Sequence, residues 1–112
     1  MPEHGTYTIT MTERAGAIGE CPARPSAEVV VDATFGKEPF DRSTGCERTI
    51  DEQACTSVID CDQSSDGVRR RTVNRLEFSR SGATGSSTIT STRTSDDEVT
   101  MSCAWDVEWV AK

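Results

Sequence analysis

Apolar and polar residues alternate along several short segments of the chain, a pattern typical of strands that bury one face. The clearest case is EVTMSCAWDVEWV, residues 98–110, in which every odd position from Val99 to Trp109 is apolar. The same reasoning predicts five further strands, at residues 5–12, 27–35, 54–61, 68–80 and 87–95. The pattern therefore indicates a chain built mainly from β-strands.

The segments between these strands are rich in turn-forming residues. Residues 13–26 contain two glycines and two prolines, and residues 36–53 form a long polar connection with room for one helical turn near its end. Asp66-Gly67 is a hairpin signal, and the short later connections predict that the last three strands form a meander. The prediction is an all-β fold, a small antiparallel β-sandwich or barrel of six to eight strands.

One expected strand contains a conflict of register. Val73 has the opposite parity to Leu76 and Phe78, so a β-bulge within residues 68–80 is needed if all three face the core. The residues expected to point inward are Tyr7, Ile9, Met11, Val29, Val31, Ile59, Leu76, Phe78, Ile89, Val99, Met101, Trp105, Val107 and Trp109. This set is barely large enough to fill the core of one small domain.

Length and composition favour a single domain over residues 1–112, with residues 1–4 as a disordered extension ahead of it. Only 34% of the residues are hydrophobic and only six are aromatic, so the two tryptophans supply much of the apolar area. We expect Trp105 to be in the core. Trp109 lies nearer the end of its strand, and we expect it to be partly exposed at an opening, where it could face a ligand.

The net charge of −7 argues against a nucleic-acid partner and against binding to anionic membrane surfaces. No apolar run approaches the ~18 residues of a membrane-spanning helix. The chain carries five cysteines without the spacing of a zinc site, which favours one or two disulfides in an oxidising compartment. A cytosolic protein with reduced thiols is the alternative.

The pairing of the cysteines stays open at this stage. Cys61 and Cys103 both lie on apolar strand faces, so a bridge between them is the first expectation. Cys46 would then pair with Cys55, and Cys21 would remain unpaired. A bridge from Cys21 to Cys46 is nearly as consistent with the sequence.

Two segments, GTYTITMTERAGAIGECP and FSRSGATGSSTITSTRTSDDEVTMSCAWDVEWV, flank a central GC…C…C pattern. In this combination the chain resembles small cysteine-containing secreted or lipid-anchored proteins of Gram-negative bacteria, of the kind common in myxobacteria. The resemblance implies a β-rich fold at the cell envelope: secreted, periplasmic or anchored to the outer membrane through a segment preceding residue 1. It implies no activity and no site residues.

Candidate chemistry is sparse. His4 is the only histidine and lies near the N-terminus, where a catalytic base could not be held rigidly. The acidic stretch 60–67 departs from a Ca²⁺ loop, because Ser65 stands where glycine is required and Arg71 where glutamate is required. Residues 69–71, RRR, are expected to pair with acidic side chains across the sheet, although binding of an anionic partner is the alternative.

The sequence thus predicts no catalytic, cofactor-binding or metal-ligating residues. The expected function is a non-enzymatic, secreted or cell-envelope binding or structural module with a protein partner. One alternative is a small lipocalin-like barrel that binds an apolar ligand. Another is a proteinaceous enzyme inhibitor.

Overall fold

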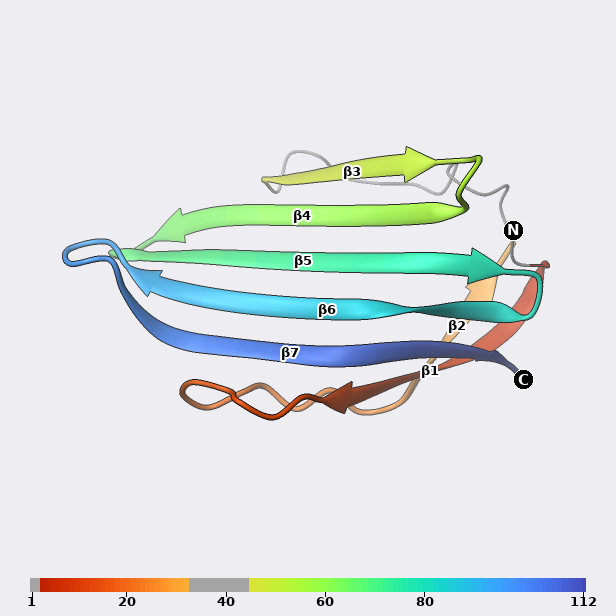
Figure 1. Cartoon of the computed structure of the whole chain (residues 1–112), viewed down its shortest axis with the longest axis horizontal. Coiled ribbons are helices and arrows are strands. Elements are labelled where there is room, and N and C mark those ends of the chain that lie inside the picture. Colours follow the sequence, from red (N-terminus) through yellow and green to blue (C-terminus); the bar gives the residue numbers. More distant parts are fainter. Residues whose placement is uncertain (1–2, 33–44) are drawn as a thin grey trace.

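The computed structural model describes residues 3–32 and 45–112, and every regular element in these ranges is a β-strand. The strands are β1 (Gly5–Glu13), β2 (Ala27–Val31), β3 (Cys46–Asp51), β4 (Thr56–Ser65), β5 (Val68–Ser79), β6 (Gly82–Arg93) and β7 (Glu98–Ala111). They form one antiparallel sheet in the order β2-β1-β7-β6-β5-β4-β3 (Figure 1). The predicted all-β class and the meander of the last three strands are confirmed.

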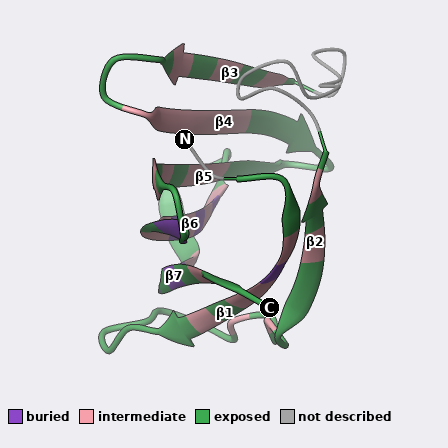
Figure 2. Cartoon of the chain, turned by 90° about the vertical axis from the view of Figure 1, so that its right-hand side faces the viewer, coloured by how far each residue is buried: buried purple, intermediate pink, exposed green. Residues whose placement is uncertain are grey.

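The sheet is strongly curled. Figure 2 shows β3 to β7 along one side of the molecule and β2 on the opposite side, with β1 joining the two. The result is a half-barrel with a concave inner face and a convex outer face. Because residues paired directly across antiparallel strands share a face, the pairing register assigns each described strand residue to one of the two faces.

The hairpin predicted at Asp66-Gly67 is confirmed. Asp66 has a φ of 52° and Gly67 a φ of 76°, and β4 pairs with β5 on either side, starting from Ser65 opposite Val68. Two positive φ angles in a two-residue loop are those of a type I′ turn, whose twist matches the right-handed twist of the strands. This local signal therefore fixes the register of β4 against β5.

Two expectations about the strands are corrected. Strand β3 lies within the segment expected to be a polar connection, because Cys46, Arg48 and Ile50 alternate with charged or hydroxyl residues and pair with β4. Strand β6 begins at residue 82, five positions before the expected start, so the turn between β5 and β6 is shorter than predicted. The predicted strand at 27–35 is described as far as Val31, and residues 33–35 lie outside the described residues.

The bulge expected in β5 is absent from its pairing with both β4 and β6. Val73 therefore lies on the convex face, opposite to Leu76 and Phe78. The register shift occurs instead between β6 and β7, at Ser91/Thr92. Because of this shift, Val99 does not share a face with the inner residues of β7. Val99 is 40% exposed, so the prediction that it points inward is wrong.

At the N-terminus, residues 1–2 of the predicted disordered extension lie outside the described residues. Glu3 is tied to the sheet. Its backbone N–H donates to the carbonyl of Arg80, and its own carbonyl accepts a 2.6 Å hydrogen bond from the Tyr7 hydroxyl. These contacts hold the start of the described chain against the β5–β6 hairpin.

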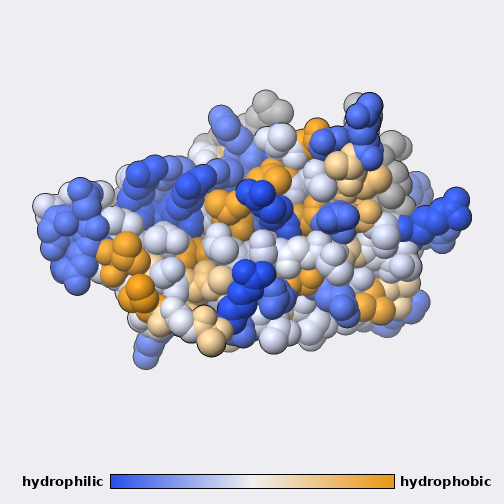
Figure 3. Space-filling view, in the orientation of Figure 1, coloured by the Kyte–Doolittle hydropathy of each residue, from blue (hydrophilic) through white to orange (hydrophobic). Residues whose placement is uncertain are grey.

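The core is small. Among the described residues, the buried hydrophobic side chains are Tyr7, Ala83, Ile89, Cys103, Trp105 and Val107. Trp105 is only 2% exposed, as predicted, and packs with Ile89 and Cys103 at the centre of this core. The convex face carries hydroxyl and charged side chains with small separate apolar areas, which the space-filling view shows (Figure 3).

Candidate functional site

The concave face carries most of the large apolar side chains of the described chain, and many are only half-buried. On β7, the odd positions from Cys103 to Trp109 pair with inner residues of β6, and from Trp105 onward also with β1. The half-buried apolar residues on this face are Ile9, Met11, Val29, Val31, Ile50, Ile59, Leu76, Phe78, Met101 and Trp109. The inner face is therefore apolar and partly open to solvent.

An aromatic group occupies one end of this face. The Trp109 ring lies 5.3 Å from Phe78, centroid to centroid, in an edge-to-face arrangement, and 6.3 Å from Tyr7. Such pairs are favoured because the positive ring edge meets the negative ring face. Trp109 is half-buried, which confirms the prediction that it is partly exposed near the strand end.

A polar pair crosses the middle of the face. The Ser87 hydroxyl donates a 2.6 Å hydrogen bond to Oδ1 of Asn74, directly opposite on β5. Ser87 is 2% exposed, so this bond removes the cost of burying two polar groups without partners. On its other side Ser87 lies opposite Trp105.

Arg24 lies above Trp105, with the guanidinium carbon 5.0 Å from the ring centroid, within the range of a cation–π interaction. Its segment is anchored to β7 by the disulfide between Cys21 and Cys103 and, further upstream, by reciprocal backbone hydrogen bonds between Ile18 and Ser102. Nε of Arg24 is buried without a hydrogen-bond partner among the described residues.

Ser91 provides the second buried polar atom without a partner in the described part of the chain. The residue is 4% exposed, its hydroxyl makes no hydrogen bond there, and it lies on the inner face of β6. The arginine opposite it on β5, Arg70, is exposed on the same face. Buried polar atoms are normally satisfied, so these two atoms are exceptions to the usual pattern.

Sequence reasoning missed Arg24 and Ser91. Arg24 lies in a loop between two prolines, where no periodicity reports which side chains turn inward. The available signal was its position three residues after Cys21, because a disulfide from Cys21 to a strand carries the intervening loop onto the sheet. Ser91 shares the parity of Ile89, which was predicted to be inward.

The predicted disulfide pairing is wrong, although two disulfides are present. Cys21 pairs with Cys103, and Cys46 pairs with Cys61, its direct neighbour across β3 and β4. Cys55 takes part in neither disulfide and lies in the β3–β4 turn with a φ of 55°.

Cys61 and Cys103 do share the inner face, as expected from their parity. Two strands, β5 and β6, separate them, however. The gap of three strand spacings, roughly 14 Å, is about twice the Cα separation that a disulfide can span.

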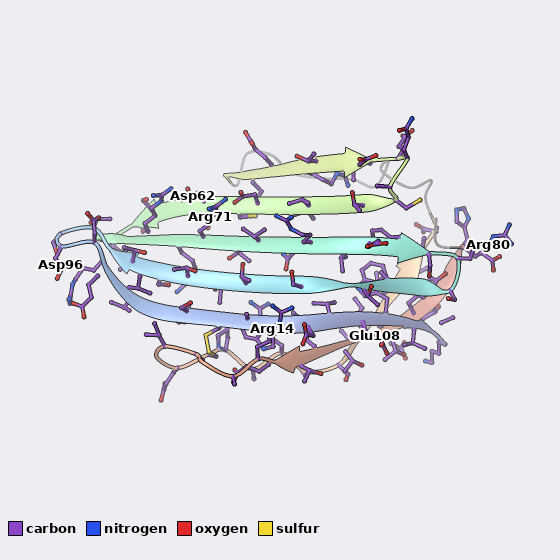
Figure 4. All side chains as sticks on the ribbon, in the orientation of Figure 1. Arg14, Asp62, Arg71, Arg80, Asp96 and Glu108 are labelled. Carbon is purple, nitrogen blue, oxygen red and sulfur yellow. A yellow bond between two sulfur atoms is a disulfide. The ribbon has the colours of Figure 1, made fainter. Side chains whose placement is uncertain are left out.

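The convex face carries ion pairs between neighbouring strands. Arg69 binds Asp62 and Arg71 binds Asp60, with N–O distances of 2.5 and 2.6 Å, and Figure 4 shows Asp62 and Arg71 side by side. The hydrogen bonds from these guanidiniums lower the pKa of both carboxyl groups. The predicted cross-sheet pairing of the RRR segment is thus confirmed for its first and third arginines.

His4, the single histidine of the sequence, is exposed near the N-terminus. Residues 3–32 and 45–112 contain no group of three or more side chains that could hold a metal ion. No helix in those ranges is long and apolar enough to cross a membrane.

No protein-family model, curated protein or solved structure matches the chain at a significant level.

Proposed function

We propose that this protein is an exported, non-enzymatic binding domain that holds a small amphipathic ligand on the concave face of its half-barrel. The observation that carries this proposal is the row of half-buried apolar side chains on the inner face, beside a core in which six of the described hydrophobic residues are buried. Apolar faces left partly open in this way are typical of ligand-binding and interaction sites.

The energetics support the same conclusion. Burying apolar surface stabilises a domain by about 25 cal/mol per Å², and a chain with so few apolar residues gains from burying each one. Leu76, Phe78 and Trp109 are nevertheless half-buried on a concave surface, while the convex face displays threonines and ion pairs. A ligand on the inner face would complete the burial of these side chains.

Two parts of the proposal, export and a non-enzymatic role, rest on separate observations. Two disulfides are compatible with an extracellular or secreted location, where such bonds persist. For catalysis, a histidine base would have to be His4, which is exposed near the chain start. The protein is therefore proposed to act by binding, at the cell envelope or in the external medium.

A second candidate is a module that binds another protein along the edge strand β2. This strand is the last of the described strands on its side of the sheet, and Val30 on it is 64% exposed. Edge strands accept an added strand through their unpaired backbone groups. The concave face is favoured because it concentrates many more apolar side chains.

The test is a titration with the neutral apolar dye N-phenyl-1-naphthylamine, followed by dye fluorescence, together with native mass spectrometry of the exported protein. Leu76→Gln and Val73→Gln form a matched pair, because the two residues lie on opposite faces of β5. We expect dye binding to be lost only in Leu76→Gln, with both variants folded by circular dichroism. Absence of dye binding to the wild-type protein, or equal loss in both variants, would contradict the proposal.

A further inference from the structure

We infer that the disulfide between Cys46 and Cys61 is a redox-sensitive latch, which holds strand β3 in the wall of the concave face and releases it when a dithiol reduces the bond. The part of this inference that concerns ligand binding rests on the proposed function, because it specifies how binding on that face is regulated. Selective reduction of the latch and release of β3 do not depend on any ligand.

The first argument is that the two disulfides differ in exposure. Cys103 is 3% exposed within the hydrophobic core, and its partner Cys21 packs against the same core. Cys46 and Cys61 are both half-buried, on the concave face where β3 pairs with β4. A reductant must bring a thiolate directly onto a sulfur atom, so accessible disulfides are the labile ones. The latch should therefore react before the bond in the core.

The second argument is that the pairing of β3 is weak without the latch. In the described part of the chain, β3 pairs with β4 alone, over its six residues. On the convex side of this pair Glu47 lies directly opposite Asp60, and like charges in this position disfavour pairing. Asp60 is itself bound to Arg71 on β5, so the ion pair draws it away from β3.

The third argument is that β4 is held to β5 independently of β3. The two strands pair along the whole of β4 and are joined by the type I′ turn. Two ion pairs also connect them, Arg69 with Asp62 and Arg71 with Asp60. Proteins open locally in units that can be as small as one weakly held element. Loss of the latch should therefore free β3 and leave β4 to β7 folded.

Release of β3 changes the concave face. Ile50 lies opposite Ser57 on β4, and Ser57 lies opposite Leu76 on β5, so the three residues form one row on this face. Without β3 the row loses Ile50, and the edge of β4 is uncovered. A ligand that lies against Leu76 would lose apolar contact on this side, so reduction should weaken its binding.

The reductant is a compound or protein with two neighbouring thiols. Its thiolate attacks the Sγ atom of Cys46 or Cys61, which forms a mixed disulfide and releases the other cysteine as a thiolate that takes up a proton. The second thiol of the reductant, as its thiolate, then displaces the remaining protein sulfur and closes a disulfide within the reductant. The reductant is oxidised by two electrons, and the latch becomes two thiols.

The first test is reduction of the folded protein by increasing concentrations of dithiothreitol, in a Cys55→Ser background. Thiols are trapped by alkylation and located by mass spectrometry of peptides. We expect Cys46 and Cys61 to be alkylated at concentrations that leave Cys21 and Cys103 bonded. Reduction of both disulfides together, or of the core disulfide first, would overturn the latch.

Hydrogen exchange of the same samples measures the release of β3. Amide exchange in β3 should rise by up to about 100-fold on reduction, the factor that corresponds to opening a loop of this length. Exchange in β6 and β7 should not change. An unchanged rate in β3, or an equal rise throughout the sheet, would contradict release of a single strand.

A matched pair of variants tests the cause of the weak pairing. Glu47→Lys places a positive charge opposite Asp60, whereas Thr49→Lys adds the same charge opposite Val58 on the same face of β3. After reduction, β3 should stay better protected in Glu47→Lys than in the wild type, and Thr49→Lys should not have this effect. Equal protection in the two variants would contradict the role given to the opposed carboxylates.

Titration with N-phenyl-1-naphthylamine tests regulation of the concave face. The reduced protein should bind the dye about 5-fold more weakly than the oxidised protein, the value of one half-buried isoleucine. Equal affinity of the two forms would overturn the regulation of binding, even if β3 is released. If the oxidised protein does not bind the dye, the proposed function fails, and alkylation and hydrogen exchange still decide whether the latch exists.

Discussion

Cys21 is bonded to Cys103, 82 positions further along the chain, and this bond ties the loop after β1 to the centre of β7. The other disulfide, between Cys46 and Cys61, spans only 15 positions. In the chain-entropy account, a cross-link stabilises the native state more when it closes a longer loop of the unfolded chain. The two bonds should therefore contribute unequally to stability.

We expect Cys21→Ser/Cys103→Ser to lower the free energy of unfolding by about 4.5 kcal/mol and Cys46→Ser/Cys61→Ser by about 3 kcal/mol. Urea denaturation of the oxidised proteins measures both. A Cys55→Ser background prevents exchange with the remaining thiol. The opposite order of the two losses would show that effects other than loop closure dominate.

Trp105 is the largest side chain at the centre of the core. Its replacement in Trp105→Ala leaves a cavity that the surrounding strands cannot fill, and we expect a loss of about 3–5 kcal/mol in urea denaturation. Trp109→Ala should cost less, because Trp109 is already half-buried. Similar losses for the two variants would indicate that Trp109 also belongs to the packed core.

Gly85 is a position at which β5 and β6 approach closely. A Cβ atom placed there would lie 1.9 Å from the carbonyl oxygen of Arg75, so the backbone itself must move. We expect Gly85→Ala to destabilise the protein by about 1–3 kcal/mol, the usual cost of overpacking. Ser86→Ala, one residue along the same strand, is the control and should change the melting temperature little.

The ion pairs of the convex face make stability depend on pH. The pKa values of Asp60 and Asp62 are lowered in the folded state by hydrogen bonds from Arg71 and Arg69. Their contribution is therefore present above the unfolded-state pKa of about 3.9 and is lost as the pH falls through the lower folded-state values. Because the groups are exposed, the effect is small and screened by salt.

We expect the melting temperature to fall modestly from about pH 5 to about pH 2 at low ionic strength. In Asp60→Asn/Asp62→Asn the slope over this range should be reduced. A series of thermal melts at fixed salt provides the measurement. If the double variant has the same slope as the wild type, other carboxyl groups govern the acid transition.

Alternation along the chain predicted most strands because each of them buries one face. Strand β7 was predicted at residues 98–110 and spans Glu98–Ala111. Strand β3 was missed because CERTID has few apolar residues and becomes a strand by pairing with β4. Parity likewise identified the shared face of Cys61 and Cys103, but it contains no information about the order of strands in the sheet.

The candidate site was predictable only in part. Trp109 was assigned correctly to a partly exposed position because strand ends are less covered than strand centres. Arg24 was not, since its place over Trp105 depends on a disulfide between residues far apart in the sequence. Contacts of this kind follow from tertiary structure and leave no local pattern.

The strand order has a consequence for how the protein is made. In the described part of the chain, strand β1 joins the rest of the sheet only through β7, the last of the seven strands found there. The N-terminal hairpin therefore has no place to dock until the C-terminal strand is available, and assembly depends on contacts distant in sequence, which slow folding. Completion of the sheet therefore waits for β7 to be synthesised, whatever the state of the strands between the two ends.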